Sequence, residues 1–575
     1  MSRNASESYF HLPIPTRPWL FVRDGLHPTQ TTLLGAIMTL AFAMRLGSMH
    51  FLTGSVDWEG AEYIRLAQNL IAGNGYIGIN LPGKNLMFPP LYPYFISGLS
   101  LIVGNFEISA RLISVALGTA TVIPAFLLAR ALYNETVGYV AALVVAFAPL
   151  LVHFSGTGNS ETTYLFFVLC ALAASVRCLS NPTWLSYAVT GFFLGLAYLT
   201  RVEAAPLLAA MLAVHSVDAF RRSRDLKHPL WPNLLKAGLL PATFALVALP
   251  YVFWLSVETG QLRIEGKSPL NIQTAARVVL NNEDINKVHF EVDTQLNERG
   301  IWMRPYLDTI KAQRLDPIFV VNYIAAKMRT AVPWFGKTVL SRAFGTPALF
   351  GLIVLGLILL PPRPETRLGH SMLLLVLAVM FLESLLIVFL NVRFILPMLP
   401  ILLIWASAGI VGLVALVPAI SKHIRQYTWG AVGASPILAA LALCVLAVSH
   451  IATVRAGPLA LFNQRSIPIK SAAQDLAKDG AANRVLVGPS TVAFHANAKY
   501  CPFPYTDSDT ALRYFDKRGV NYLVISNEDD ATPYLKAWWD YGVPSPAAVL
   551  MRSVVSGGVS YRIYRWTGLS PDHGN

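Results

Sequence analysis

Leu33-Leu-Gly-Ala-Ile-Met-Thr-Leu-Ala-Phe-Ala-Met-Arg45 begins the first of many apolar runs, and Asp57-Trp-Glu59-Gly-Ala-Glu62-Tyr63-Ile-Arg65 follows it closely. Such runs dominate the 575 residues, of which 54% are hydrophobic and only 13% charged. An ordinary soluble domain carries about 25% charged residues. A mean hydropathy of +0.50 therefore excludes a soluble globular protein, a disordered protein and a coiled coil. The composition predicts an α-helical polytopic membrane protein.

The apolar runs predict about eleven membrane spans, several of them short for a bilayer about 30 Å thick. The first, 31–50, carries Arg45 near its far end, where it has a functional role or extends to the membrane surface. The runs lie near 31–50, 110–130, 137–154, 160–179, 185–200, 203–218, 235–256, 345–361, 370–391, 394–418 and 429–453.

Basic residues in the loops predict the orientation, because cytoplasmic loops are enriched in Lys and Arg. With the N-terminus in the cytoplasm, five basic residues lie in short outside segments: Arg65, Lys84, Arg111, Arg201 and Arg393. Fourteen lie in short inside segments: Arg3, Arg17, Arg23, Arg130, Arg177, Arg221, Arg222, Arg224, Lys227, Lys236, Arg363, Arg367, Lys422 and Arg425. We expect a multi-pass protein of the cell (inner) membrane. The net charge of +13 is attributed to this bias and to anionic lipid, not to nucleic acid.

Three segments are then expected outside the cytoplasm. They are a first outer loop, 51–109, a long outer loop, 257–344, and a tail, 455–575, after a membrane domain of residues 1–454. The tail has strand-like stretches at 484–488, 520–526 and 558–565 and a helical pattern at 509–517. This order predicts a small C-terminal α/β domain.

The first outer loop holds the strongest candidates for chemistry. Tyr63, Ile64 and Ile71 belong to an amphipathic helical pattern that three carboxylates, Asp57, Glu59 and Glu62, precede or open. Acidic residues at a helix N-terminus are favoured by the helix dipole alone. The functional alternative is a general base at the membrane surface that takes a proton from an acceptor.

Glu161 is a second candidate, because it opens a span just after a very short outer connection. A carboxylate at the rim of the hydrocarbon is costly unless it faces protein or water. It could act as a helix cap, but Asn159 or Ser160 would do so more cheaply, and we favour a functional role.

Arg201 and Arg393 lie at the outer rim, from spans far apart in the sequence. They either anchor the protein in the headgroup region or clamp a lipid-linked phosphate, for which a guanidinium is well suited. For Glu203, a local ion pair with Arg201 is the plainer explanation. The long outer loop adds Glu258, Lys267 and an amphipathic helical pattern from Asp316.

These motifs together resemble the GT-C glycosyltransferases, in particular protein O-mannosyltransferases and lipid A aminoarabinose transferases. The resemblance lies in the acidic residue four positions before an aromatic (Glu59 to Tyr63), Gly73-Asn-Gly75-Tyr76, Pro89-Pro-Leu-Tyr92-Pro, Leu199-Thr-Arg201 and Arg393-Phe-Ile-Leu-Pro.

The resemblance implies transfer of a sugar from a polyprenyl phosphate to a lipid, glycan or protein acceptor outside the cytoplasm. It implies Glu59 or Asp57 as the base, with Glu161 as a second acid. Candidates for binding the donor phosphate are Arg201, Arg393, Arg65, Lys84 and Lys267. Candidates for the acceptor side are Glu62, Tyr63, Tyr92 and Glu258. No cofactor is required by this reading, and a divalent metal stays open.

Trp538-Trp-Asp-Tyr-Gly542 matches a signature of oligosaccharyltransferases, where it helps to recognise a glycosylation sequon. The alternative, which we favour, is that the tryptophans pack the small domain. A third function class is a transporter for lipid-linked sugars, but the charges cluster at one rim and no paired repeat is present.

Overall fold

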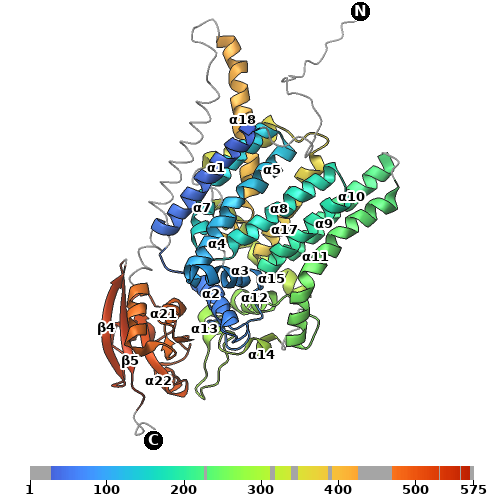
Figure 1. Cartoon of the computed structure of the whole chain (residues 1–575). Helices are drawn as coiled ribbons and strands as arrows, with labels where there is room; N and C mark the ends of the chain where they lie inside the picture. Colours follow the sequence, from blue (N-terminus) through green and yellow to red (C-terminus); the bar gives the residue numbers. More distant parts are fainter. Residues whose placement is uncertain are drawn as a thin grey trace, which may run out of the picture.

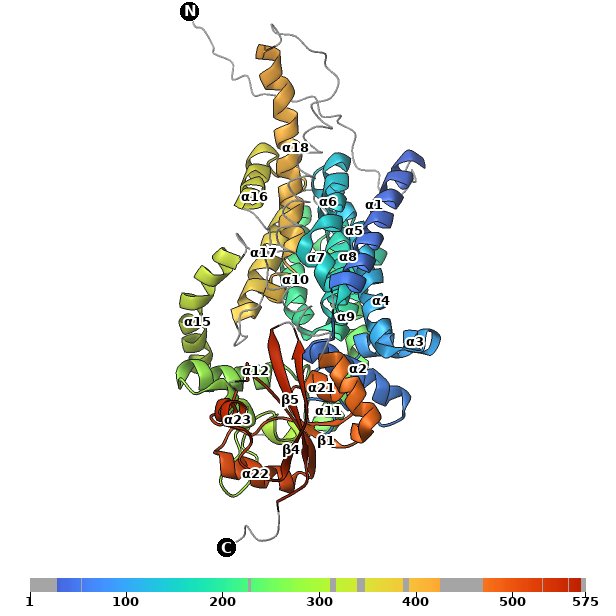
Figure 2. The same ribbon diagram turned by 90° about the vertical axis from the view of Figure 1, so that its left-hand side faces the viewer.

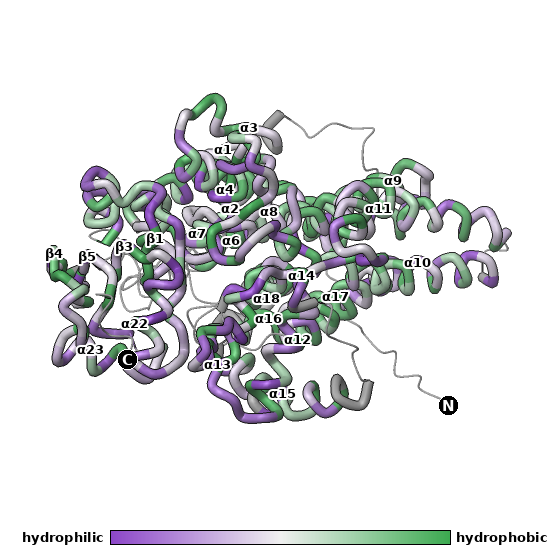
Figure 3. Tube along the Cα trace, turned by 90° about the horizontal axis from the view of Figure 1, so that it is seen from below, coloured by the Kyte–Doolittle hydropathy of each residue, from purple (hydrophilic) through white to green (hydrophobic). Residues whose placement is uncertain are grey.

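The computed structural model describes residues 28–52, 54–225, 229–310, 317–338, 347–385, 392–424, 469–529, 531–556 and 558–569. A long helical bundle occupies most of the chain, and a small domain with a sheet lies beneath one end of it (Figures 1 and 2). Hydrophobic residues concentrate along the bundle helices (Figure 3). The helices up to the end of the long outer loop, which is the second outer loop in chain order, are α1 (Pro28–Gly47), α2 (Trp58–Ile71), α3 (Leu91–Val103), α4 (Phe106–Ala120), α5 (Val122–Leu132), α6 (Glu135–Phe147), α7 (Pro149–Gly156), α8 (Glu161–Ser180), α9 (Trp184–Thr200), α10 (Ala205–Asp225), α11 (Leu230–Thr259), α12 (Ser268–Ala275), α13 (Ile285–Phe290), α14 (Tyr306–Ile310) and α15 (Pro317–Thr338).

The bundle is completed by α16 (Pro347–Leu359), α17 (Arg367–Leu385) and α18 (Leu399–Ile424), with a short 3₁₀ helix, η5 (Val392–Phe394), before α18. Among the described residues, seven helices are long and apolar enough to cross a membrane, or eight if α6 and α7 count as one bent span. An apolar helix lies at each predicted span up to 418, and the span predicted at 429–453 lies outside the described residues. The chain is a multi-pass membrane protein.

The bend between α6 and α7 follows from Pro149, which disfavours helical geometry at the preceding residue. Ala148 leaves the helical conformation (φ −57°, ψ 120°), and the two helices meet at 52°. Arg45 of α1 is fully buried beside this bend. Its guanidinium donates to the carbonyls of Val145 and Ala146, at 3.2 and 3.0 Å. A cation at the C-terminal end of a helix complements both the free carbonyls and the helix dipole.

Small residues let α9 and α11 approach closely. A Cβ at Gly191 would lie 2.2 Å from the carbonyl oxygen of Leu240, and one at Gly195 would lie 2.7 Å from the Val247 side chain. Spacing by four residues places both glycines on one helix face, as in many membrane helix pairs.

Helix α3 was not predicted from the sequence. Pro90 precedes the helix, and Gly104 in the left-handed conformation (φ 72°) ends it. Leu101 and Ile102 are 74% and 84% exposed. The helix projects sideways from the bundle (Figure 2).

The small domain contains a five-stranded sheet in the order β2-β1-β3-β5-β4. Strand β1 runs parallel to β2 and β3, whereas β5 pairs antiparallel with β3 and β4. The predicted strands are β1, β3 and β5; the two that were not predicted are β2 and β4. The elements are β1 (Val485–Val487), α21 (Ser490–His495), β2 (Lys499–Cys501), α22 (Ser508–Lys517), β3 (Val520–Ser526), α23 (Leu535–Tyr541), β4 (Ala548–Ser556) and β5 (Val559–Trp566).

Strand β3 is buried on both faces of the sheet, because its side chains alternate between two cores. Leu523 and Ile525 face α22 and α23, whereas Tyr522 and Val524 face α21 and helical residues 469–476. Val292 and Met303 of the second outer loop enter the first of these cores. That loop and the small domain therefore share a core, although the sequence separates them. The boundary predicted near 455 lies outside the described residues.

Candidate functional site

The N-terminus of α2 brings two of the predicted carboxylates into different environments. Asp57 is the helix cap, and its Oδ1 accepts from the Gly60 amide at 2.8 Å. Its Oδ2 accepts from Asn159 Nδ2 at 2.8 Å. Glu59, on the first turn, instead accepts from Arg393 Nη2 at 2.7 Å. Helix capping, the simpler interpretation of these acids, therefore applies to Asp57.

Glu59 begins a chain of alternating charges that joins five separate segments. Arg393, next to Phe394 in η5, also lies 3.7 Å from Glu161 Oε1 at the start of α8. Arg201 at the end of α9 contacts that same oxygen at 3.0 Å. We call the full set the charge cluster; its members, in order of contact, are Glu59, Arg393, Glu161, Arg201, Glu203 and Lys267.

The second half of the charge cluster closes on the long outer loop. Arg201 Nη2 lies 3.2 Å from Glu203 Oε1, which confirms the local ion pair expected for Glu203. Lys267 Nζ reaches the same oxygen at 2.8 Å. Three cations face three carboxylates, so the cluster is neutral when all are ionised. Such balance is the condition for burying charge at tolerable cost.

Burial is uneven along the charge cluster. The Glu161 and Arg201 side chains are 3% and 8% exposed, whereas Arg393 and Glu203 are 23% and 21% exposed. Arg393 and Glu203 are therefore more exposed than the Glu161–Arg201 pair of the charge cluster.

Three carboxylate oxygens of the charge cluster have unused acceptor capacity. Glu59 Oε2, Glu161 Oε2 and Glu203 Oε2 are buried and accept no hydrogen bond from the described residues. A buried acceptor without a donor typically costs about 1–3 kcal/mol. Hydroxyl or amine groups of a ligand would supply the missing donors.

Electrostatics keep Glu59 ionised. Burial raises the pKa of its carboxyl, but the nearby positive charges of Arg393, Arg201 and Lys267 outweigh burial, so the pKa lies below the ordinary glutamate value. The same contact raises the pKa of Arg393. Both side chains are charged at neutral pH.

Glu62 is separated from the charge cluster and organises the first loop. It is fully buried and accepts from the Ile79 and Asn80 amides at 2.8 Å each, and from Asn80 and Asn85 side chains. Burial raises the pKa of Glu62, and these hydrogen bonds lower it in part. Gly78 leaves room for the carboxylate, since a Cβ there would lie 1.6 Å from Glu62 Oε1.

Other predicted site residues lie elsewhere. Lys84 pairs with Glu258 at 2.6 Å, with Lys84 53% exposed. Arg65 turns toward the small domain and donates to Asn497 Oδ1 at 3.2 Å. Neither Lys84 nor Arg65 is linked to the charge cluster by any described ion pair.

The two tyrosines pack behind the carboxylates. Tyr63 is buried, with its hydroxyl 2.9 Å from Ser160 Oγ, and its ring meets Tyr92 edge-on at 5.2 Å. The Tyr92 hydroxyl donates to the Ala110 carbonyl at 3.0 Å. Both rings support α2 against α4 and the start of α8.

Sequence reasoning missed Asn159 as a partner of Asp57, and it missed Glu383. Glu383 lies near the end of α17, within electrostatic range of Glu203, Lys267 and Arg201, and its buried Oε1 has no hydrogen-bond partner among the described residues. The signal was available: a carboxylate inside an apolar span is a functional candidate by default.

The tryptophans of residues 538–542 pack the small domain, as we favoured. Trp538 is 2% exposed and its Nε1 donates to Ser508 at 3.0 Å. The Arg562 guanidinium lies 4.3 Å from the centre of the Trp539 ring. Tyr541 is 89% exposed, and Asp540 beside it is exposed as well.

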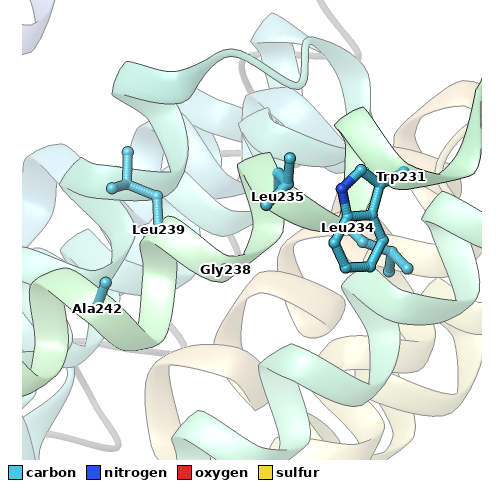
Figure 4. A pocket seen from close by; sticks show the side chains of 6 residues that line it. All are labelled: Trp231, Leu234, Leu235, Gly238, Leu239 and Ala242. Carbon is cyan, nitrogen blue, oxygen red and sulfur yellow. The ribbon is translucent and has the colours of Figure 1, made fainter.

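A shallow apolar groove runs along the first half of α11 (Figure 4). The groove is remote from the charge cluster. It lies at the start of α11, whereas Lys267 follows the other end of this 30-residue helix. A groove of this composition suits lipid chains, so we assign no polar chemistry to it. Its lining residues are Trp231, Leu234, Leu235, Gly238, Leu239 and Ala242.

Comparison of the structure with solved ones identifies the architecture. ArnT from Cupriavidus metallidurans, solved bound to undecaprenyl phosphate, is similar over 93% of this chain and 98% of its own, with a TM-score of 0.53 and 14% identity. The chain has the GT-C fold. The Archaeoglobus fulgidus oligosaccharyltransferase tethered with an acceptor peptide containing the NVT sequon matches over 89% of this chain and 71% of its own, with a TM-score of 0.53 and 15% identity.

Sequence comparison adds a partial match to this GT-C assignment. Residues 88–254 match the family of dolichyl-phosphate-mannose-protein mannosyltransferases, which is less than half of the chain. No curated protein matches the sequence. Among the described residues, no group of three or more His, Cys, Asp or Glu side chains is placed to hold a metal ion.

Proposed function

We propose that this chain is a membrane glycosyltransferase that takes a sugar from a polyprenyl-phosphate donor and passes it to an acceptor outside the cytoplasm. The observation that carries the proposal is the charge cluster, in which Glu59, Arg393, Glu161, Arg201, Glu203 and Lys267 meet at one end of the bundle. It supplies both the carboxylates and the cations that such a transfer needs. The GT-C fold and the partial family match support it.

In the proposed reaction, an acceptor hydroxyl or amine attacks the anomeric carbon of the sugar. The bond between that carbon and the phosphate oxygen breaks, and the lipid phosphate leaves with the bonding electrons. Glu59 takes the proton from the acceptor. It is better placed than Asp57, because both Asp57 oxygens already accept hydrogen bonds whereas Glu59 Oε2 is unused.

The cations stabilise the negative charge that develops on the phosphate. Arg201 and Arg393 are the leading candidates, because a guanidinium can bind two phosphate oxygens, and Lys267 adds a charge at the loop side. A phosphate that binds Arg393 competes with Glu59 for it. Donor binding would then release Glu59 and raise its basicity when the acceptor is in place.

A second candidate is transfer to a peptide sequon. The likeness to the archaeal oligosaccharyltransferase and the Trp-Trp-Asp-Tyr-Gly sequence favour it, whereas the burial of Trp538 opposes it. A synthetic sequon peptide offered as acceptor, with and without divalent cations, separates the two.

The test compares cells that lack the gene with cells that express the parent protein, Glu59→Gln or Asp475→Asn. Mass spectrometry of extracytoplasmic glycans, lipids and proteins should find a sugar modification that the parent and Asp475→Asn restore and Glu59→Gln does not. Asp475 is a matched control because it is an acid of the small domain that is 39% exposed and pairs with Lys478 and Arg552, away from the charge cluster. An unchanged set of modifications without the gene would refute the proposal.

A further inference from the structure

Contacts between the small domain and the first outer loop converge on the residues just before α2. His495 Nε2, at the end of α21, lies 2.5 Å from the Ser55 hydroxyl. Ser55 is two residues before the cap Asp57 and four before Glu59. Figure 2 shows α21 next to α2, although more than 400 residues separate them in the sequence.

A second set of contacts connects the small domain to Gly54, the residue before Ser55. Lys470 Nζ binds both oxygens of Glu107, at 2.8 and 2.9 Å. Glu107 in turn lies 2.7 Å from Arg111, and the Arg111 guanidinium donates to the Gly54 carbonyl at 2.7 Å. A charge of the small domain is thus connected, through two side chains of α4, to the backbone that leads into α2.

The middle of α2 is held from the same side. Arg65 donates to Asn497 and lies 5.8 Å from the centre of the Phe494 ring. One domain therefore contacts α2 before its first turn and along its length. None of these groups belongs to the charge cluster, to which the proposed transfer is assigned.

We propose that His495 and Lys470 are positioning residues: the small domain fixes the N-terminus of α2 and so sets where Glu59 stands relative to Arg393 and Glu161. A misplacement of about 1 Å can cost roughly 10²-fold in rate. The proposal rests on the proposed function for its catalytic consequence. We call the contacts of His495 with Ser55 and of Lys470 with Glu107 the clasp, and their effect on the first loop can be measured without any substrate.

The first measurement is amide hydrogen exchange of the full-length protein in detergent or nanodiscs. His495→Ala and Lys470→Met should each speed exchange at residues 54–62, with exchange in β1 and β3 unchanged. Lys478→Met is the matched control, because Lys478 belongs to the same domain and its side chain is 79% exposed. His495→Gln, which retains a hydrogen-bonding group, should recover most of the protection.

The second measurement is transfer kinetics of the same variants. We expect kcat to fall by about tenfold to 10²-fold in His495→Ala and Lys470→Met, with the donor KM within about twofold, because Arg201 and Lys267 stand on other segments. His495→Gln should regain kcat. If the parent protein has no transfer activity, the proposed function is wrong. The exchange measurement then still shows whether the clasp holds the N-terminus of α2.

Ser55→Ala provides an independent check if a variant of the small domain folds poorly. It removes the same hydrogen bond from the side of the loop and should likewise speed exchange at residues 54–62. Exchange at 54–62 that is equal in His495→Ala, Lys470→Met and Lys478→Met would overturn the proposal. So would faster exchange with unchanged kcat, which would leave a clasp without a role in positioning.

Discussion

Six side chains, three acidic and three basic, neutralise one another at the end of the bundle. Buried ion pairs are poor sources of stability, because desolvation offsets the attraction between the charges. In the proposed reaction these pairs are exchangeable: a phosphate would replace a carboxylate at Arg393 or Arg201, and a hydroxyl would donate to an unused carboxylate oxygen.

The two acids of α2 should differ in their effect on transfer. Glu59→Gln should abolish transfer with expression intact, since loss of a general base typically costs about 10²–10⁴ in rate. Asp57→Asn retains an oxygen for the Gly60 amide and should cost less. Initial rates with saturating donor decide the order, and a dead Asp57→Asn beside a near-normal Glu59→Gln would show that Asp57 is the base.

Arg393 should set the pH dependence of transfer. Its charge is the largest influence that holds the pKa of Glu59 below the ordinary value, against burial, which raises it. In the parent protein, the acidic fall of kcat/KM should therefore lie below the usual glutamate range. In Arg393→Met the effect of burial remains without its main counterweight, so the fall should move to higher pH.

A pH series of kcat/KM measures this shift. Arg299→Met is the control, because Arg299 is 63% exposed and pairs with Asp293, away from the charge cluster. An acidic limb at the same pH in Arg393→Met and in the parent would show that Glu59 does not titrate as the base.

At the scale of elements, the charged residues of the site lie at helix ends and at breaks between helices. Glu161 follows the bent α6–α7 pair that Pro149 interrupts and Arg45 braces. Arg201 stands in extended conformation where α9 ends. The first loop is organised in the same way, by backbone amides gathered around the buried Glu62.

Gly78→Ala should destabilise that loop. The added Cβ would lie 2.3 Å from Glu62 Cδ, and Glu62 cannot move away without losing its hydrogen bonds. Overpacking of this kind typically costs about 1–3 kcal/mol. Thermal unfolding of the purified protein should show a lower Tm for Gly78→Ala.

Gly98→Ala is the matched control in the same outer loop, because a Cβ at Gly98 would meet nothing within 4 Å. Its Tm should equal or exceed that of the parent. If Gly78→Ala is as stable as Gly98→Ala, the loop is not built around Glu62.

At the scale of the whole molecule, the small domain shares a core with the second outer loop and contacts the first one. Val292 and Met303 lie among its buried residues, and Tyr505 pairs with Phe290 through the backbone at 2.7 Å. The domain and both outer loops must therefore lie on the same side of the membrane.

The distribution of basic residues predicts that this side is outside the cytoplasm. In intact cells, Lys478→Cys should react with a membrane-impermeant maleimide, because Lys478 is exposed on the small domain. Arg221→Cys, exposed at the opposite end of α10, should react only after the cells are opened. The reverse pattern would invert the topology.

The membrane-protein class, most of the apolar helices and three of the five strands could be predicted from the sequence. These features depend on local hydrophobicity and on periodicity, which are written in consecutive residues. The sequence also indicated Glu59, Glu161, Arg201 and Arg393 as candidate site residues at one rim of the membrane. A charged side chain beside hydrocarbon is unfavourable in free energy and therefore marks a functional candidate.

Which of these charges meet became clear from the three-dimensional structure alone. Glu59 and Arg393 are 334 residues apart, yet they lie 2.7 Å from each other, whereas Arg65 faces another domain. No local pattern specifies such pairing, because it depends on helix packing and on the bends that aim each segment. The same holds for the contact of His495 with Ser55, which arises where the small sheet domain meets the first loop.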